Sequence, residues 1–194
     1  MNVVRILSKR AGRLATFLTV VSLVVLVDQS TKAAVRFVAP LGSPARPLVP
    51  GLLDLWHVEN TGAAFSIGQG ASVVFIMFAL AVLIGSAWWV MCERLPLRLV
   101  VSVASVAGGG VGNMVDRLST GSVTDFLSLH FIDFPVFNVA DICVTLGVLV
   151  AFILYITWDG QRTSTSFKED LDIVDTATEP HKEVAKSDLR QNNA

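Results

Sequence analysis

The chain contains one uncharged run, residues 71–92, that is long enough to cross a lipid bilayer. A transmembrane helix needs about 20 consecutive, mostly apolar residues. Residues 99–115 and 137–158 are similarly apolar, and residues 14–37 form a fourth run that is interrupted only near its end. Of the 194 residues 53% are hydrophobic and 16% charged, whereas soluble domains carry about 25% charged residues. We therefore predict an all-α polytopic membrane protein with four transmembrane helices.

The first run follows a basic segment, and in that respect it is like a cleavable signal peptide. We reject this interpretation because no A-x-A site follows and three further spans do. The apolar part, residues 14–27, is too short to span, so we expect the helix to continue through Asp28 and Lys32 to about residue 37. The i, i+4 spacing places Asp28 and Lys32 on one helix face, which we expect to point into the protein.

Between the first two spans, residues 38–70 are punctuated by proline and glycine and contain an alternating stretch at residues 53–58. Such a pattern predicts strands in an extramembrane loop. In the third span Ala104, Gly108 and Gly112 recur every four residues, and small residues at that spacing allow helices to approach closely in lipid.

Four spans place both termini on one side of the membrane. Basic residues in segment 1–13, with Arg94 and Arg98, mark that side as cytoplasmic, although Lys32, Arg36, Arg46 and Arg117 lie near the other side. We divide the chain into a basic cytoplasmic N-terminus (1–13), a membrane domain (14–158, outer loops about 38–70 and 118–136) and a polar tail (159–194) that we expect to be disordered. This topology gathers polar residues of four segments at the outer face: Asp28, Lys32, Asn113, Asp116, Arg117, Asp125, Asn138 and Asp141.

Several function classes are disfavoured by the residues themselves. A net charge of −1 argues against a nucleic-acid partner. The three histidines show no metal-ligand spacing and the two cysteines no CxxC, so we expect neither a metal nor another cofactor. There is no G-x-S-x-G nucleophile elbow, and a Ser-Lys hydrolase built on Lys32 has only Ser30 and Ser66 as nucleophiles.

Residues 108–141 carry four aspartates, Asp116, Asp125, Asp133 and Asp141, between two apolar runs. Carboxylates at the membrane are costly unless they are paired, hydrated or used. Two that face each other share one proton near neutral pH, and such a pair can activate water and protonate an amide. The alternative is structural: each aspartate caps a helix or pairs with Arg117. For Asp116, adjacent to Arg117 in sequence, we favour this structural alternative.

Five motifs together resemble the lipoprotein signal peptidases, the type II signal peptidases of bacteria. They cover residues 14–158 in the family's order: Asp28–Lys32 (DQSTK), Asn60–Ser66 (NTGAAFS), Gly112–Leu118 (GNMVDRL), Val123–Phe126 (VTDF) and Phe137–Asp141 (FNVAD). The resemblance implies an aspartic endopeptidase of the bacterial plasma membrane, with its active site near the outer face. It implies that the substrates are prolipoproteins carrying diacylglycerol on a cysteine, which are cut just before that cysteine. The other partners that we expect are membrane lipids, and nothing in the sequence requires more than a monomer.

The same resemblance assigns roles to residues. Asp125 and Asp141 would be the catalytic pair. Substrate binding and support of the site would fall to Asn60, Gly62, Asn113, Arg117, Asn138, Asp28 and Lys32. Residues 38–70 would form a small extracytoplasmic β-sheet, and residues 119–135 a second short, mobile outer element.

Two other function classes stay open at this stage. A small four-span proton-coupled transporter would use the acids as an ion relay, although carriers place such groups near the midplane and often show internal repeats. A membrane scaffold would need no paired acids and would tolerate asparagine at positions 125 and 141.

Overall fold

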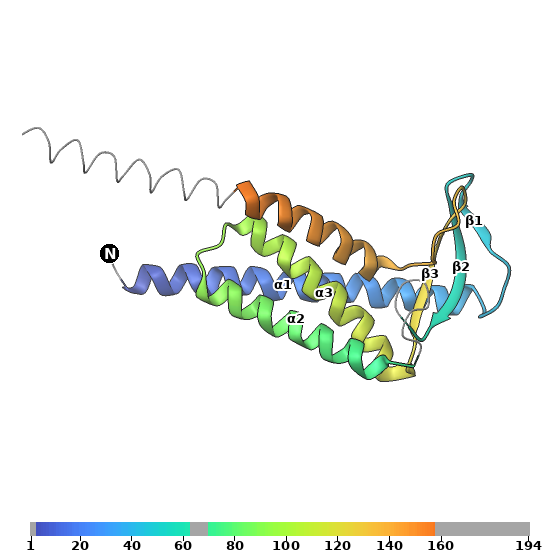
Figure 1. The fold of residues 1–194 in the computed structure, drawn as a ribbon, viewed down its shortest axis with the longest axis horizontal. Coiled ribbons are helices and arrows are strands. Elements are labelled where there is room, and N and C mark those ends of the chain that lie inside the picture. Colours follow the sequence, from blue (N-terminus) through green and yellow to red (C-terminus); the bar gives the residue numbers. More distant parts are fainter. Residues whose placement is uncertain (1–2, 63–69, 158–194) are drawn as a thin grey trace, which may run out of the picture. The chain divides into compact units, whose positions relative to one another are not determined.

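The computed structural model describes residues 3–62 and 70–157, with side chains from residue 10 onward. Within these residues, four helices are long and apolar enough to cross a membrane: Arg10–Val38, Ser72–Cys92, Leu97–Thr120 and Val139–Thr157. The first belongs to α1 (Val3–Val38), and the next two are α2 (Ser72–Cys92) and α3 (Leu97–Thr120) (Figure 1). The prediction of four spans is confirmed. The polar tail, 159–194, lies outside the described residues.

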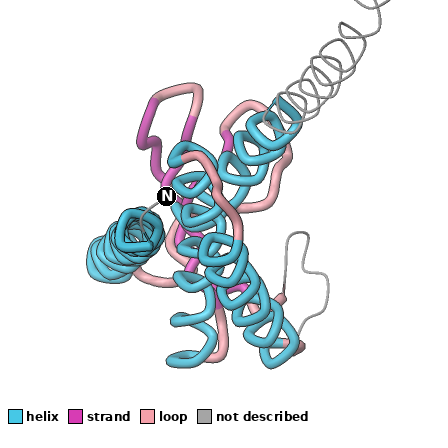
Figure 2. The backbone as a smooth tube through the Cα atoms, turned by 90° about the vertical axis from the view of Figure 1, so that its left-hand side faces the viewer, coloured by secondary structure: helices cyan, strands magenta, loops and turns pink. Residues whose placement is uncertain are grey.

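The third span, α3, is the central helix. It contacts both α1 and α2 (Figures 1 and 2), and 56% of its most apolar window is buried, against 11% in each of the other spans. It runs beyond the predicted end at residue 115 and stops at Gly121, whose left-handed backbone (φ 81°) suits glycine. Asn113, Asp116 and Arg117 therefore all lie on one rigid helix.

Three antiparallel strands lie at the end of the helices where α1 finishes (Figure 1). They are β1 (Arg46–Val49), β2 (Leu53–Asn60) and β3 (Val123–Leu129), in the order β1-β2-β3. The first two strands come from the predicted sheet region. β3 comes from the second outer segment and pairs with β2 along its length, so both outer segments contribute to one sheet. The mobility expected of the second segment remains a prediction.

Apolar contacts fix the sheet to α1. Val35 of α1 and Ala39, directly after its end, pack against Phe126 and Leu127 from β3, and all four are buried. Leu127 also forms an isolated bridge to Phe137, just before the fourth helix begins. The chain directly after Asp125 is therefore held by α1 and by the segment before the fourth helix.

Glycines allow α3 to approach its neighbours closely. A Cβ at Gly108 would lie 2.8 Å from Val24 Cβ, and one at Gly112 would lie 2.6 Å from Asp28 Oδ2. The predicted close approach is confirmed at these two positions. Gly109 makes a contact of the same kind that the four-residue spacing does not predict: its Cβ would lie 2.5 Å from the carbonyl oxygen of Ala140.

Candidate active site

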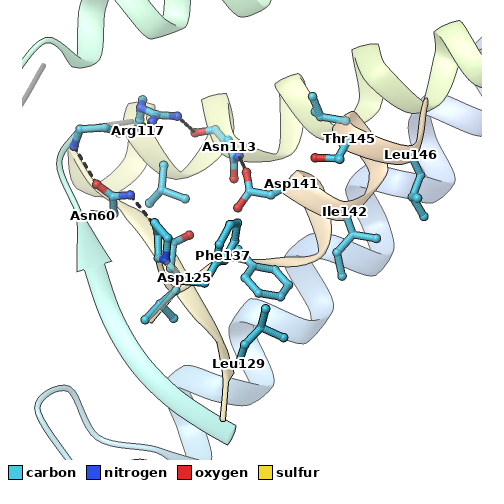
Figure 3. A pocket seen from close by; sticks show the side chains of 16 residues that line it. Asn60, Asn113, Arg117, Asp125, Leu129, Phe137, Asp141, Ile142, Thr145 and Leu146 are labelled. Atoms are coloured by element: carbon cyan, nitrogen blue, oxygen red, sulfur yellow. Dashed lines mark hydrogen bonds between the residues drawn. The ribbon is translucent and has the colours of Figure 1, made fainter. Parts of the chain in front are cut away.

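Asp125 lies on β3 and is buried, with 3% of its surface exposed. Its Oδ2 accepts a hydrogen bond from Asn60 Nδ2 on β2 (2.9 Å) and its Oδ1 accepts one from Asn138 Nδ2 (2.7 Å). Two amide groups from distant segments therefore fix both carboxyl oxygens of Asp125, and Figure 3 shows the bond from Asn60.

Asp141 lies in the first turn of the helix Val139–Thr157. Its Oδ2 accepts from the backbone N–H of Asn138 (3.0 Å), while Asn138 Oδ1 accepts from the N–H of Asp141 (3.1 Å). This reciprocal pair is a capping box. One oxygen of Asp141, Oδ2, therefore has the helix-capping role of the structural alternative. The other oxygen, Oδ1, accepts from Asn113 Nδ2 at 2.8 Å.

Asn113 and Asn138 connect the two acids. Asn138 Nδ2 donates to Asn113 Oδ1 (3.0 Å) as well as to Asp125, and Asn113 in turn donates to Asp141. Asn138 is fully buried. The two aspartates therefore belong to one continuous hydrogen-bond network.

The surroundings of Asp125 raise its pKa and so favour the protonated form up to about pH 6. Burial is the largest cause and the charge of Asp141 acts in the same direction, while the hydrogen bonds from Asn60 and Asn138 and the charge of Lys32 lower the pKa, and the net result is a pKa of about 6. Asp125 can thus hold a proton at a pH where an exposed aspartate has lost it.

Behind the pair lies a buried ion cluster. Lys32 Nζ is 2.9 Å from Asp28 Oδ2 and 2.9 Å from Asp116 Oδ2, which confirms that Asp28 and Lys32 point into the protein. The predicted pairing of Asp116 with Arg117 is wrong: Asp116 pairs with Lys32 and, at 3.8 Å, with Arg36. Successive residues point to different faces of a helix, and the side of α3 that faces α1 carries Asp116.

Arg117 connects α3 to the first outer loop. Its Nη2 donates to the carbonyl oxygen of Gly62 (2.8 Å), and its guanidinium lies 4.8 Å from the ring centre of Phe75 on α2. Gly62 N–H donates to Asn60 Oδ1 (2.9 Å). The cluster predicted from sequence therefore includes Gly62, although residues 63–66 of the same motif lie outside the described residues.

A pocket of about 500 Å³ opens beside the two aspartates (Figure 3). Asn60, Asn113, Arg117, Asp125 and Asp141 form its polar end, and its other wall is apolar: Leu129, Phe134, Phe137, Ile142, Val144 and Leu146. These wall residues were not predicted from the sequence. The only signal for Ile142 and Leu146 was their i, i+4 spacing within the last span, directly after Asp141.

The pKa of Asp125 makes stability depend on pH. An unfolded aspartate ionises near 3.8, so between that pH and about 6 the folded protein binds more protons, and stability falls as pH rises. The free energy of unfolding falls by at most about 3 kcal/mol over this range, because the pKa differs by about two units between the folded and unfolded states. We expect Asp125→Asn to remove this slope in thermal unfolding measured in detergent at pH 4 to 7. The exposed control Glu93→Gln should keep it, and an unchanged slope in Asp125→Asn would contradict the assignment.

Two acids at the polar end of one pocket, carried by a four-span bundle, have the makeup of a membrane aspartic peptidase. Residues 20–157 match the sequence model of the family described as signal peptidase (SPase) II. The chain is 41% identical over 153 residues to the lipoprotein signal peptidase of Parasynechococcus marenigrum (strain WH8102), covering 78% of this chain and 94% of that one.

Two further comparisons agree. Identity to the lipoprotein signal peptidase of Streptococcus pneumoniae (strain ATCC BAA-255 / R6) is 36% over 135 residues, covering 69% of this chain and 88% of the relative. A bacterial membrane enzyme solved by the in meso method superposes with a TM-score of 0.69 at 29% identity, over 74% of this chain and 88% of that one. The chain belongs to the lipoprotein signal peptidases, the signal peptidase II family of aspartic peptidases that remove signal peptides from prolipoproteins. The carrier and scaffold alternatives are therefore set aside.

Proposed function

We propose that Asp125 and Asp141 are the catalytic pair of this peptidase. The observation that carries the proposal is their shared position: both line the polar end of one pocket and are joined through Asn113 and Asn138. Asp125, whose pKa is raised to about 6, is the member that carries the shared proton. Asp141 is the base.

The reaction needs two proton transfers. Asp141 takes a proton from a water molecule as the water oxygen attacks the scissile carbonyl, and Asp125 gives its proton to the carbonyl oxygen. The tetrahedral intermediate then collapses: its hydroxyl returns the proton to Asp125, and Asp141 protonates the leaving nitrogen. Both acids end as they began, and no covalent bond to the protein forms.

The apolar wall supports a substrate that carries acyl chains. Ile142, Val144 and Leu146 line the pocket along the fourth helix, directly beyond Asp141. Acyl chains packed on this wall would hold the neighbouring amide at the two acids, and binding energy remote from the bond would then promote its cleavage. We therefore propose that the substrates carry a diacylglyceryl-modified cysteine and are cut just before it.

We further propose that both termini are cytoplasmic and that the sheet and the pocket lie at the outer face. The basic residues of segment 1–13 with Arg94 and Arg98 support this orientation.

Three residues that line the pocket, Asn60, Gly62 and Arg117, have polar groups suited to binding a peptide backbone. Substrate binding is the role we propose for these three.

Purified protein in detergent tests the substrate proposal with one prolipoprotein in lipidated and unlipidated forms. We expect kcat/KM to be at least about 100-fold higher for the lipidated form, because the acyl chains supply the positioning. Mass spectrometry of the products should place the cut before the modified cysteine. Equal cleavage of both forms, or a cut elsewhere, would refute this substrate class.

A further inference from the structure

Two buried aspartates, Asp28 and Asp116, each accept a hydrogen bond from a backbone N–H directly beside a proposed catalytic aspartate. Asp28 Oδ1 accepts from the N–H of Ala140 at 3.0 Å, one residue before Asp141. Asp116 Oδ2 accepts from the N–H of Thr124 at 3.2 Å, one residue before Asp125. The fourth helix and β3 are thus each held, directly behind the reacting carboxyl group, by an acid from another helix.

Lys32 connects these two acids. Its Nζ is 2.9 Å from Asp28 Oδ2 and 2.9 Å from Asp116 Oδ2, and Lys32 and Asp28 have no exposed surface. A buried ammonium between two carboxylates fixes their separation, because moving either acid away leaves a buried charge unpaired. Gln29 Nε2 bonds both acids as well, at 3.2 and 3.1 Å.

A third contact of Lys32 reaches the reacting groups from the other side. Lys32 Nζ donates to Asn113 Oδ1 at 2.8 Å. Asn113 Nδ2 donates to Asp141, and Asn138, which also bonds Asn113 Oδ1, donates to Asp125. Lys32 is therefore one side-chain amide away from Asp141 and two from Asp125.

We propose that the Asp28–Lys32–Asp116 triad is a spacer that sets the distance between the two catalytic carboxyl groups. It acts through the backbone N–H groups of Ala140 and Thr124 and through Asn113, and its members are positioning residues that do not touch substrate. The inference rests on the proposed catalytic role of Asp125 and Asp141. Besides holding the helices together, the triad thus raises the rate of the chemical step.

The spacer has a signature that a purely structural cluster lacks. Two carboxyl groups that share a proton titrate in two steps separated by their mutual repulsion, and these steps bound the pH range in which kcat is high. Added separation weakens the repulsion and narrows that range, by about half a pH unit per ångström at an effective dielectric of about 20. The variants described below leave the other charged residues near the pair unchanged. These residues are Arg36, Glu59 and Arg117.

Matched substitutions separate the backbone contact from the charge. Asp28→Asn and Asp28→Leu both remove the charge, yet only asparagine keeps an oxygen for the N–H of Ala140. Asp116→Asn and Asp116→Leu make the same comparison at Thr124. Either single change leaves Lys32 paired with the remaining acid. Glu93→Gln, an exposed acid at the C-terminus of α2, is the control for loss of an acid elsewhere.

We expect the leucine variants to lose about 100-fold in kcat, as for a misplacement of about 1 Å, with KM within about threefold and a narrowed pH range. The asparagine variants should stay within about tenfold of wild type. Leucine variants with the kcat and pH range of wild type would overturn the inference. So would equal losses in both variants with an unchanged pH range, because that result marks a structural role only.

Folding is checked by thermal unfolding in detergent. Where a leucine variant does not fold, the triple variant Asp28→Asn/Lys32→Met/Asp116→Asn takes its place. This neutral cluster keeps both oxygens for the N–H groups but lacks the ammonium that links the two acids and bonds Asn113, so kcat should fall about 100-fold with a narrowed pH range. A wild-type kcat and pH range in the folded triple variant would overturn the spacer. Asp125→Asn and Asp141→Asn separate the two proposals. If both cleave substrate, the catalytic pair is wrong. If both are inactive while the triad variants behave as wild type, only the spacer is wrong.

Discussion

Asp125→Asn and Asp141→Asn are each expected to lower kcat on a lipidated prolipoprotein by at least about 10³-fold. An amide can neither take a proton from water nor deliver one to the scissile bond, and general acid–base catalysis contributes roughly 10²- to 10⁴-fold for each group. Losses at the two positions should not add, because the pair acts as a unit. The double variant should therefore be about as inactive as either single one, measured by single-turnover cleavage.

Substrate affinity separates a catalytic loss from a folding defect. Both variants keep the size of the side chain, and the remaining oxygen still accepts one of the two hydrogen bonds that the carboxyl group accepts. Binding of lipidated substrate should thus stay within about threefold of wild type. Glu93→Gln, at the end of α2, should cleave at the wild-type rate. Cleavage near the wild-type rate by either asparagine variant would remove that residue from the pair.

Local sequence patterns were sufficient for the membrane fold because its constraints are local. Each span is a continuous stretch of the chain, so apolar length alone predicts it. Asp28 and Lys32 could be assigned to one buried face for the same reason, since their spacing lies within one helix. Their confirmed ion pair has both side chains fully buried.

Contacts between distant segments could not be predicted in this way. The pairing of β3 with β2 joins residues from 63 positions apart (Asn60 and Val123) to 76 positions apart (Leu53 and Leu129), and nothing in either strand specifies the other. Asp116 illustrates the same limit. Its sequence neighbour Arg117 suggested a pair, but the rotation of α3 directs Asp116 to Lys32 and Arg117 to Gly62. The apolar wall was missed because Ile142 and Leu146 look like any lipid-facing residues of a span.

The four aspartates of residues 108–141 show what family resemblance added to residue patterns. Composition marked all four as costly, and only the motifs distinguished Asp125 and Asp141 from the others. The structure explains why the remaining buried acid is needed: Asp116 neutralises Lys32 and binds the N–H of Thr124. The site thus contains two pairs of acids. Asp125 and Asp141 face the pocket, and Asp28 and Asp116 lie behind them on Lys32.

Gly109→Ala is expected to lower both the melting temperature and kcat, while Gly110→Ala, its neighbour on α3, does neither. A Cβ at position 109 would lie 2.5 Å from Ala140 O and 2.7 Å from Val144 Cγ2, whereas at position 110 the nearest atom is Ala79 Cβ at 3.7 Å. A backbone oxygen cannot turn aside, so the fourth helix must shift. Overpacking of this kind costs about 1–3 kcal/mol. Both changes gain about 1 kcal/mol in helix propensity, which makes Gly110→Ala a matched control.

The loss of activity should exceed what unfolding explains. Ala140 directly precedes Asp141, so a shift of the fourth helix moves the proposed base relative to Asp125, and a displacement of about 1 Å can lower the rate roughly 100-fold. We expect kcat of folded Gly109→Ala, measured well below its melting temperature, to fall at least about tenfold. Gly110→Ala should match wild type. Equal melting temperatures and rates in the two variants would show that the fourth helix can yield at Gly109 without moving the site.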